Sequence, residues 1–232
     1  MSHHRPLLLG HRGARQYAPE NTLAAFDLAL QHGCDGFEFD VRYTRDSRAV
    51  VCHDPSYEGR EILTSAFADL SGPGGVSLPY ADEVIRRFAP RAFLDIELKV
   101  AGELGTILAA LAEAPGTDSF VISSFVPEVL EAAYARVQGL PLGYICDDAG
   151  QLSRWKTLPV SAVMLHEDLA SSTTLDELHR AGKKTFVWTV NREQRMREFA
   201  ERGVAGIISD DTRLLAQVFT RREPTDFQYR SR

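Results

Sequence analysis

The feature that most constrains the fold is a regular alternation of short apolar runs with amphipathic stretches along the 232-residue chain. The apolar runs are rich in Val, Ile, Leu or Phe and have the length of strands. They are Leu7–Gly10, Gly36–Thr44, Ala49–His53, Ala92–Lys99, Phe120–Phe125, Leu142–Cys146, Ala162–Leu165, Thr185–Val190 and Gly206–Ser209. Alternation of this kind predicts a parallel sheet, because a helix can carry the chain back to where the next strand begins.

The stretches between these runs repeat apolar residues at helical spacing. In the first of them Asn21-Thr22 is expected to cap a helix, and Gly33 is expected to end it. Further helices are predicted over Tyr80–Phe88, Glu103–Glu113, Pro127–Val137, Thr174–Ala181 and Arg192–Glu201. About eight β/α repeats in a chain of this length predict a (β/α)₈ TIM barrel, an α/β fold with a single domain.

We expect this barrel domain to span residues 1–220, with a polar C-terminal tail over residues 221–232. A doubly wound open sheet is the alternative fold. It would normally carry a glycine-rich phosphate loop after the first strand, and GHRGAR matches that fingerprint poorly.

Two irregularities interrupt the alternation. Only RDSR separates Gly36–Thr44 from Ala49–His53, which is hairpin spacing and too short for a parallel crossover. The stretch at about 55–80 then shows no clear period and is long for a connection. It is predicted to be a functional loop or a short insertion after the second strand.

Composition excludes several classes of protein. The formal net charge of −6 argues against non-specific nucleic-acid binding and against a polybasic membrane anchor. No apolar run reaches the length of a membrane span, and no signal peptide is recognisable. Cys34, Cys52 and Cys146 are odd in number and widely spaced, which favours free thiols and a cytoplasmic protein. These features leave the oligomeric state open.

Charged residues gather where the predicted strands end, which in a barrel is where chemistry takes place. Glu38 and Asp40 are two positions apart and share one face of their strand, while Phe37, Phe39 and Val41 share the other. Glu97 and Lys99 share a face in the same way. Because the apolar faces must meet the helices, Glu38, Asp40 and Glu97 are expected to converge in the barrel mouth. They either pair with nearby Lys and Arg or hold a hard divalent cation, Mg²⁺ or Ca²⁺.

Five other residues at strand ends suggest chemistry. His11 and His53 each close a strand beside the acidic residues, where imidazoles can serve as an acid and a base or, less readily, as metal ligands. Arg12 and Lys99 suit an anionic substrate oxygen, or they simply pair with the acids. Trp188 is either a substrate-facing wall or a core aromatic. Together these residues predict a metal-assisted reaction on an anionic, phosphate-bearing small molecule.

At these residues the sequence resembles the glycerophosphodiester phosphodiesterase family. The similar segments follow the family's order from residue 10 to about residue 211, which is nearly the whole chain. They are GHRGARQYAPENTLAAF, GFEFDVRYTRDSRAVVCHD, LPYADEV, LDIELK, ISSF, VWTVN and GVAGIISDD. The set is specific because it combines several motifs in one order, whereas HRG alone would be weak.

The resemblance implies a metal-dependent enzyme that cleaves a glycerophosphodiester to glycerol 3-phosphate and an alcohol. It implies that His11 and His53 are the catalytic acid/base pair and that Glu38, Asp40 and Glu97 bind the divalent cation. It further implies that Arg12 and Lys99 hold the phosphate and that Trp188 lines the substrate pocket. In this family the glycerol 2-hydroxyl is thought to attack first, giving a cyclic phosphate that water opens.

One segment departs from the family pattern. After His53-Asp54 family members commonly continue with an L-x-R-T-T-like stretch, whereas this chain reads PSYEGREILTSAF. Arg60 and Thr64 are either displaced equivalents or part of a rebuilt insertion, so the alcohol group of the substrate is not predicted. Two alternatives to the diesterase are a lysophospholipase D or lyase that stops at the cyclic phosphate, and a non-catalytic phosphate-ligand sensor.

Overall fold

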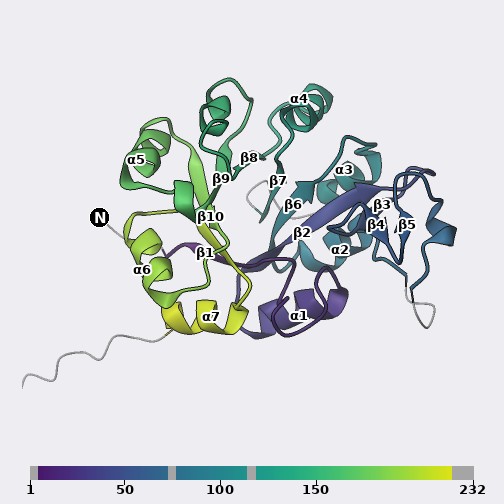
Figure 1. Cartoon of the computed structure of the whole chain (residues 1–232), viewed down its shortest axis with the longest axis horizontal. Helices are drawn as coiled ribbons and strands as arrows, with labels where there is room; N and C mark the ends of the chain where they lie inside the picture. Colours follow the sequence, from purple (N-terminus) through teal and green to yellow (C-terminus); the bar gives the residue numbers. More distant parts are fainter. Residues whose placement is uncertain (1–4, 73–76, 114–118, 221–232) are drawn as a thin grey trace, which may run out of the picture.

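The structure is a computed structural model that describes residues 5–72, 77–113 and 119–220. Eight parallel strands form a closed ring, because β1 pairs with β11 on one side and with β2 on the other. This confirms the predicted TIM barrel (Figure 1). The barrel strands are β1 (Leu7–Gly10), β2 (Gly36–Tyr43), β6 (Phe93–Leu98), β7 (Phe120–Ser124), β8 (Leu142–Cys146), β9 (Ala162–His166), β10 (Lys184–Trp188) and β11 (Gly206–Ser209).

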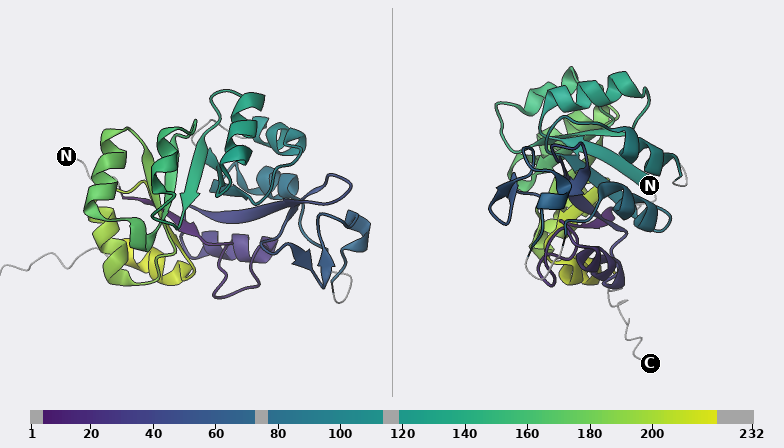
Figure 2. Two further views of the ribbon diagram at one scale, coloured as in Figure 1. Left: turned by 45° about the horizontal axis from the view of Figure 1, so that its top comes forward. Right: turned by 90° about the vertical axis from the view of Figure 1, so that its right-hand side faces the viewer.

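Helices cover the outside of the ring, as the two further views in Figure 2 show. They are α1 (Leu23–Gln31), α2 (Ala81–Phe88), α3 (Gly105–Ala112), α4 (Pro127–Arg136), α5 (Ser172–Arg180), α6 (Glu193–Glu201) and α7 (Thr212–Thr220). The last of these was not predicted. Between β8 and β9 the connection carries the short 3₁₀ helix η4 (Leu152–Lys156) instead of an α-helix, and another 3₁₀ turn, η5 (Glu167–Leu169), precedes α5.

The outer core lies between the strands and the helices. Phe37 and Phe39 of β2 point outward into it, as their spacing predicts, and both are fully buried. The ring of Phe37 stacks on Phe26 of α1 at 4.2 Å between centroids and meets Phe88 of α2 edge-on at 5.1 Å. Such aromatic contacts add to the area-dependent stabilisation. They also hold β2 so that its alternate side chains point into the barrel.

A second apolar layer fills the barrel interior. Its buried members come from six of the strands and are Leu9, Val121, Ile145, Ala162, Met164, Phe186 and Ile208. Packed side chains of this kind make the inside of a small barrel a core rather than a pore. This layer forms the floor beneath the charged residues at the mouth.

The hairpin and the insertion predicted after β2 are both present. Strand β3 (Ala49–Val51) pairs antiparallel with β2 outside the ring. The following residues form the small hairpin β4 (Ser56–Tyr57) and β5 (Arg60–Glu61) and the 3₁₀ turn η1 (Phe67–Asp69), at the right of Figure 1. Their own apolar cluster consists of Val50, Ile62, Leu70 and Leu78. The stretch is therefore a small folded lobe on the barrel.

The predicted tail at 221–232 lies outside the described residues. Within the described part of the chain, no helix combines the length and the apolar character that crossing a membrane requires.

Substitution of Gly36, at the start of β2, tests how closely β2 and β6 approach each other. A Cβ on Gly36 would lie 1.8 Å from the carbonyl oxygen of Phe93, which belongs to the neighbouring backbone. We expect Gly36→Ala to lower the free energy of unfolding by about 3 kcal/mol or more, since neither strand can move without opening the ring. Chemical denaturation would measure this.

Gly105→Ala is the matched control. A Cβ at Gly105, the first residue of α3, meets nothing within 4 Å. The same substitution there should leave stability unchanged or raise it by about 0.5 kcal/mol. Equal effects at both positions would contradict the close approach of β2 and β6.

Candidate active site

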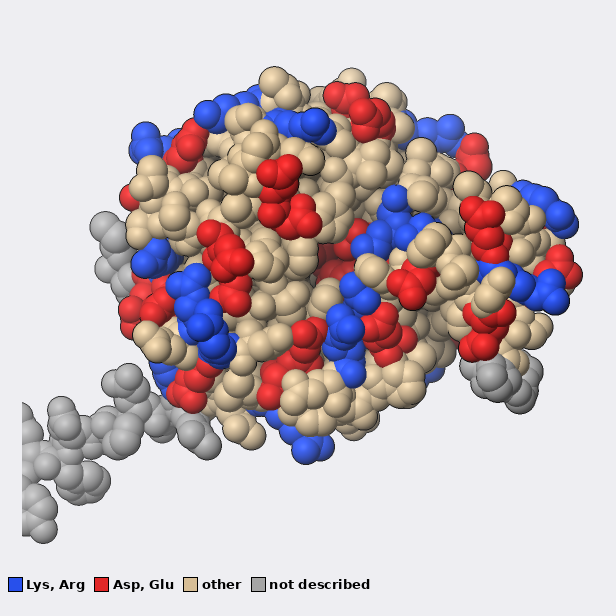
Figure 3. Space-filling view, in the orientation of Figure 1, with Lys and Arg blue, Asp and Glu red and all other residues tan. Residues whose placement is uncertain are grey.

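A cavity of about 150 Å³ opens at the carboxyl end of the barrel strands. Figure 3 looks into this hollow: carboxylates lie in its depth, and Lys and Arg side chains lie beside its opening. Its lining residues come from all eight barrel strands or the loops that follow them, and from the residues after β3. They are His11, Arg12, Glu38, His53, Asp95, Glu97, Lys99, Phe125, Ile145, Met164, Trp188 and Ile208.

The pairing of β2 with β6 brings the acidic residues together. In this parallel register Glu38 lies beside Asp95, and Asp40 lies beside Glu97. One oxygen from each of Glu38, Asp40 and Glu97 lies within 4.8 Å of the other two, and all three side chains are buried. Asp40 is fully buried and does not reach the cavity surface. The three residues nevertheless form the single cluster that the alternation of β2 and β6 predicts.

Burial and mutual repulsion act strongly on these carboxyl groups. Burial, reinforced by the neighbouring Asp40, raises the pKa of Glu38 well above its usual range and that of Glu97 to about 7. Burial would also raise the pKa of Asp40, but Lys99, Arg12 and the Asn21 amide together outweigh it and lower that pKa. Asp40 is thus the most acidic member of the cluster.

Two cations partly neutralise the cluster. The Nζ of Lys99 lies 2.9 Å from Asp40 Oδ1 and also makes an ion pair with Glu97. The Nε of Arg12 lies 3.2 Å from Asp40 Oδ2, and its backbone N–H donates to Glu38 Oε2 at 2.9 Å. The acidic residues therefore do pair with Lys99 and Arg12, which the sequence had left as an alternative to cation binding. This pairing leaves Glu38 Oε1 buried without a hydrogen bond from any described residue.

These donor atoms fit a hard divalent cation. Three carboxylates supply only oxygen ligands, which Mg²⁺ and Ca²⁺ prefer. The buried Glu38 Oε1 lacks a hydrogen-bond partner within the described chain, and a buried acceptor left in this state is costly. The residues present are consistent with a cation-binding site.

His11 is held by a network at the end of β11. Its Nδ1 lies 2.8 Å from Asp210 Oδ1, and its Nε2 lies 3.9 Å from Glu38 Oε2. Asn191 donates to Asp210 Oδ2 at 2.8 Å and accepts from the backbone N–H of Asp210 and from the Ser209 hydroxyl, both at 2.9 Å. Burial lowers the pKa of His11, although the hydrogen bond to Asp210 opposes this. The ring is thus held with Nε2 toward the acidic cluster.

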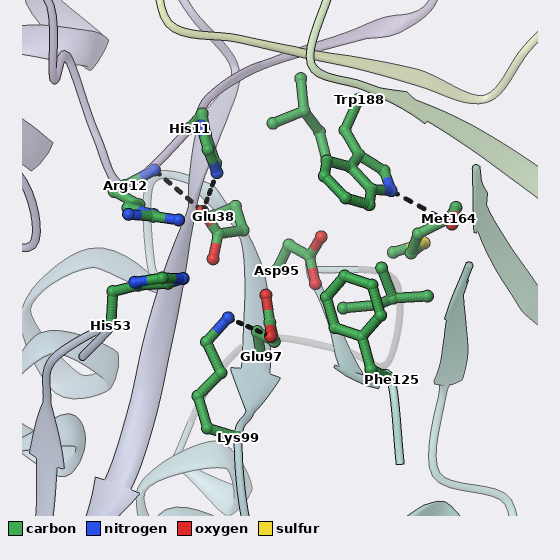
Figure 4. Close-up of a pocket in the computed structure, with 12 residues that line it drawn as sticks. His11, Arg12, Glu38, His53, Asp95, Glu97, Lys99, Phe125, Met164 and Trp188 are labelled. Carbon is green, nitrogen blue, oxygen red and sulfur yellow. Dashed lines mark hydrogen bonds and ion pairs between the residues drawn. The ribbon is translucent and has the colours of Figure 1, made fainter. Parts of the chain in front are cut away.

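His53 lies on the opposite side of the opening from the apolar wall (Figure 4). It follows β3, and its Nδ1 lies 2.8 Å from Asp54 Oδ1. Its side chain is 36% exposed, against 14% for His11. The two imidazoles therefore sit in different environments, one enclosed and one open to solvent.

The remaining wall of the cavity is apolar. Trp188 donates its indole N–H to the Met164 carbonyl at 3.2 Å and meets the ring of Phe125 edge-on at 5.6 Å. Trp188 is therefore a wall of the cavity and also packs against the inner core. The sequence had left these two possibilities open.

Asn21 corrects one expectation. The residue that caps α1 is Thr22, whose hydroxyl accepts the N–H of Ala25 at 3.2 Å. The Asn21 side chain turns inward instead: its amide nitrogen donates to Asp40 Oδ2 at 2.7 Å, and its oxygen accepts the Asp40 N–H at 3.3 Å. Ser, Thr and Asn are all good caps, so the sequence alone does not distinguish these roles.

The structure brings together all eight residues that the sequence singled out. His11, Arg12, Glu38, His53, Glu97, Lys99 and Trp188 line the cavity, and Asp40 lies directly behind it. Asp95, Asp210 and Asn191 also belong to the site, although the sequence predicted no role for them. The position of Asp95 two residues before Glu97 was the signal that it shares the inward face.

Fold and site together define a TIM-barrel enzyme whose mouth suits a divalent cation and a phosphate-bearing substrate. The sequence profile of the glycerophosphoryl diester phosphodiesterase family matches residues 11–62 and 89–214, and the chain belongs to this family of phosphoric diester hydrolases.

Individual relatives agree over nearly the full length. A glycerophosphodiester phosphodiesterase of Caldanaerobacter subterraneus is 29% identical over 235 residues, covering 91% of this chain and 96% of the relative. The crystal structure of a Thermotoga maritima glycerophosphodiester phosphodiesterase has a TM-score of 0.77 at 24% identity, covering 93% of this chain and 99% of that one. An Oleispira antarctica phosphodiesterase, solved with its product sn-glycerol-3-phosphate, has a TM-score of 0.80 at 23% identity, covering 92% and 96%.

The raised pKa of the buried Asp95 predicts that the stability of the folded protein depends on pH. Burial raises the pKa of Asp95 to about 7 in the folded protein, against about 3.9 in an unfolded chain. The folded state therefore holds its proton more tightly, and stability falls as the pH rises from about 4 to about 7. With chelator present, Asp95→Asn should show a smaller loss of unfolding free energy between pH 5 and pH 8 than the wild type.

Denaturant unfolding at both pH values measures this difference. Glu103→Gln is the control because the Glu103 side chain is 71% exposed, and it should follow the wild type. If Asp95→Asn loses as much unfolding free energy between the two pH values as the wild type does, the raised pKa of Asp95 is not a cause of the pH dependence.

Proposed function

We propose that this protein hydrolyses glycerophosphodiesters to glycerol 3-phosphate and an alcohol, with a divalent cation held by Glu38, Asp40 and Glu97. The observation that carries the proposal is the convergence of these carboxylates with two imidazoles and two cationic side chains around one cavity. The product bound to the Oleispira antarctica phosphodiesterase is in keeping with it. When bound, the cation supplies positive charge that offsets the charge developing on the phosphoryl oxygens.

Arg12 and Lys99 are the residues that would hold the phosphate. A lysine ammonium carries three N–H donors, and Asp40 and Glu97 face two of them. The third is left for a phosphate oxygen. The guanidinium of Arg12 lies beside Glu38 at the cavity wall, where it would fix a second oxygen (Figure 4).

His11 would act as the general base. A neutral imidazole that donates its Nδ1–H to Asp210 carries a free lone pair on Nε2, and the lowered pKa of His11 favours this neutral form. Nε2 would accept the proton of the attacking hydroxyl, which belongs to water or to the glycerol 2-position. Asp210, held by Asn191, would stabilise the imidazolium that results.

His53 would act as the general acid. Its Nδ1 is engaged by Asp54, which leaves Nε2 to donate a proton to the departing alcohol oxygen. The exposed position of His53 suits this role because the alcohol must leave toward solvent. Trp188 and Phe125 would enclose the apolar part of the substrate on the far side of the cavity.

The products separate this proposal from its alternatives. The cavity of about 150 Å³ matches a small organic group, and the acyl chain of a lysophospholipid would have to extend outside it. Phosphorus NMR of the products would detect a lasting cyclic phosphate if the enzyme stopped as a lyase. A ligand sensor would bind without turnover.

Metal removal tests the cation site. We expect chelator to abolish hydrolysis of glycerophosphocholine and Mg²⁺, Ca²⁺ or Mn²⁺ to restore it. Glu97→Gln should lower kcat/KM at least about 100-fold, since one anionic ligand is lost. Glu103→Gln, which removes an exposed carboxylate, should retain full activity. Undiminished turnover in excess chelator would argue against the cation.

Substitution of the histidines tests proton transfer. His11→Ala and His53→Ala should each lower kcat by about 10²–10⁴-fold, with unchanged melting temperatures. Asp210→Asn should lower kcat more than it changes KM, because Asp210 contacts the ring that moves the proton and does not line the cavity. The assignment fails if the double histidine variant keeps wild-type activity.

A further inference from the structure

Asp95 is the one acid lining the cavity that the proposed chemistry does not use. It lies on β6, two residues before Glu97, and is only 1% exposed. The Ser123 hydroxyl of the neighbouring strand donates to its Oδ1 at 2.5 Å. Among the described residues no side-chain donor to Oδ2 is found, and Asp95 is part of the cavity lining. A buried carboxylate oxygen in this position requires a donor, because an unpaired one is costly.

The surroundings of Asp95 limit what that donor can be. Figure 4 places its carboxylate between Glu97 and the wall formed by Trp188 and Phe125. On this side the lining is otherwise apolar, with Ile145, Met164 and Ile208. The indole N–H of Trp188 is already given to the Met164 carbonyl. The described residues on this side of the cavity therefore offer apolar surface and one hydrogen-bond acceptor without a donor, the carboxylate of Asp95.

The cavity consequently has two halves of different chemistry. His11, Arg12, His53 and Lys99 line one half and suit a phosphate, whereas Asp95 would repel a phosphate from the other. A group that fills the second half must not be anionic, must carry carbon against the aromatic wall, and must present a hydrogen-bond donor to Asp95, which a quaternary ammonium lacks. A short polyol chain meets these three conditions.

We propose that Asp95 is a specificity-determining residue that accepts a hydrogen bond from the outer hydroxyl of the substrate's glycerol moiety. This inference rests on the proposed function for the orientation of the phosphate. Glycerol diesters would bind with the phosphate at Arg12 and Lys99 and the three-carbon chain against Trp188. Substrates in which the outer hydroxyl is missing or acylated would leave Asp95 desolvated and unpaired.

Paired substrates test this inference. One is sn-glycero-3-phosphocholine, and the other is its analogue with a propane-1,2-diol moiety, which lacks only the outer hydroxyl and keeps the hydroxyl next to it. For the wild-type protein with Mg²⁺ we expect kcat/KM to favour the glycerol substrate at least tenfold. Asp95→Leu removes the acceptor and keeps the branching at Cγ, although its methyl groups are larger than the oxygens they replace. It should reduce the preference to below about threefold, because the acceptor of the outer hydroxyl is gone.

Two further variants separate hydrogen bonding from general disturbance of the cavity. Asp95→Asn retains a polar group and should keep an intermediate preference. Ile145→Val changes the apolar wall without touching a polar atom and should keep the wild-type preference at whatever rate remains. If Asp95→Leu does not fold, the wild-type preference and that of Asp95→Asn still decide the matter. A wild-type preference below threefold, or an undiminished preference in Asp95→Leu, overturns the inference.

A binding arm distinguishes failure of this inference from failure of the proposed function. Calorimetry would compare sn-glycerol 3-phosphate with 1,2-propanediol phosphate on the wild type and on Asp95→Leu. If no diester is hydrolysed, the proposed function fails, but a tenfold preference in binding that disappears in Asp95→Leu still supports the role of Asp95. Equal affinities of the wild type for both phosphates overturn that role whatever the turnover.

Discussion

The parallel register of β2 and β6 is the constraint on which the rest of the site depends. It places Glu38 beside Asp95 and Asp40 beside Glu97, four buried carboxyl groups on two neighbouring strands. Like charges at this separation resist ionisation, and burial adds to the cost. Two raised pKa values of about 7, for Asp95 and Glu97, express that cost.

The surrounding structure compensates for this arrangement in two ways. Lys99 and Arg12 bring positive charge to Asp40, and Asn21 donates a hydrogen bond to it. The aromatic cluster of Phe26, Phe37 and Phe88 then holds β2 from outside. Stability of the outer core thus supports a costly inner layer, as is common where binding sites are built into a fold.

The overall charge is a poor guide to such a site. A formal net charge of −6 does not by itself point to an anionic substrate. In the structure the acids lie deep, and the cationic groups of Arg12 and Lys99 lie beside them at the cavity wall (Figure 4). With a divalent cation among the carboxylates, the local balance would favour a phosphate although the whole protein is acidic.

Much of the architecture could be predicted from periodicity. Alternation along β2 predicted that Glu38 and Asp40 face the barrel interior and that Phe37 and Phe39 face the helices, because successive side chains on a strand point in opposite directions. Helix α7 was missed although Leu215 and Val218 are buried in it, since its pattern ran into the polar end of the chain. The sequence predicted a cap at Asn21-Thr22 but did not show that Thr22 alone caps α1, because the two residues have similar local preferences.

The sequence by itself determined the β/α repeat, the family, and the residue types at the barrel mouth, since all three follow from local periodicity and motif order. Only the tertiary structure decided which groups become partners. His11 and Asp210 are 199 positions apart and meet because β1 pairs with β11 to close the ring. Asp95 faces an apolar wall because strands distant in sequence supply that wall. Such contacts depend on how the strands close around one another, which no local pattern records.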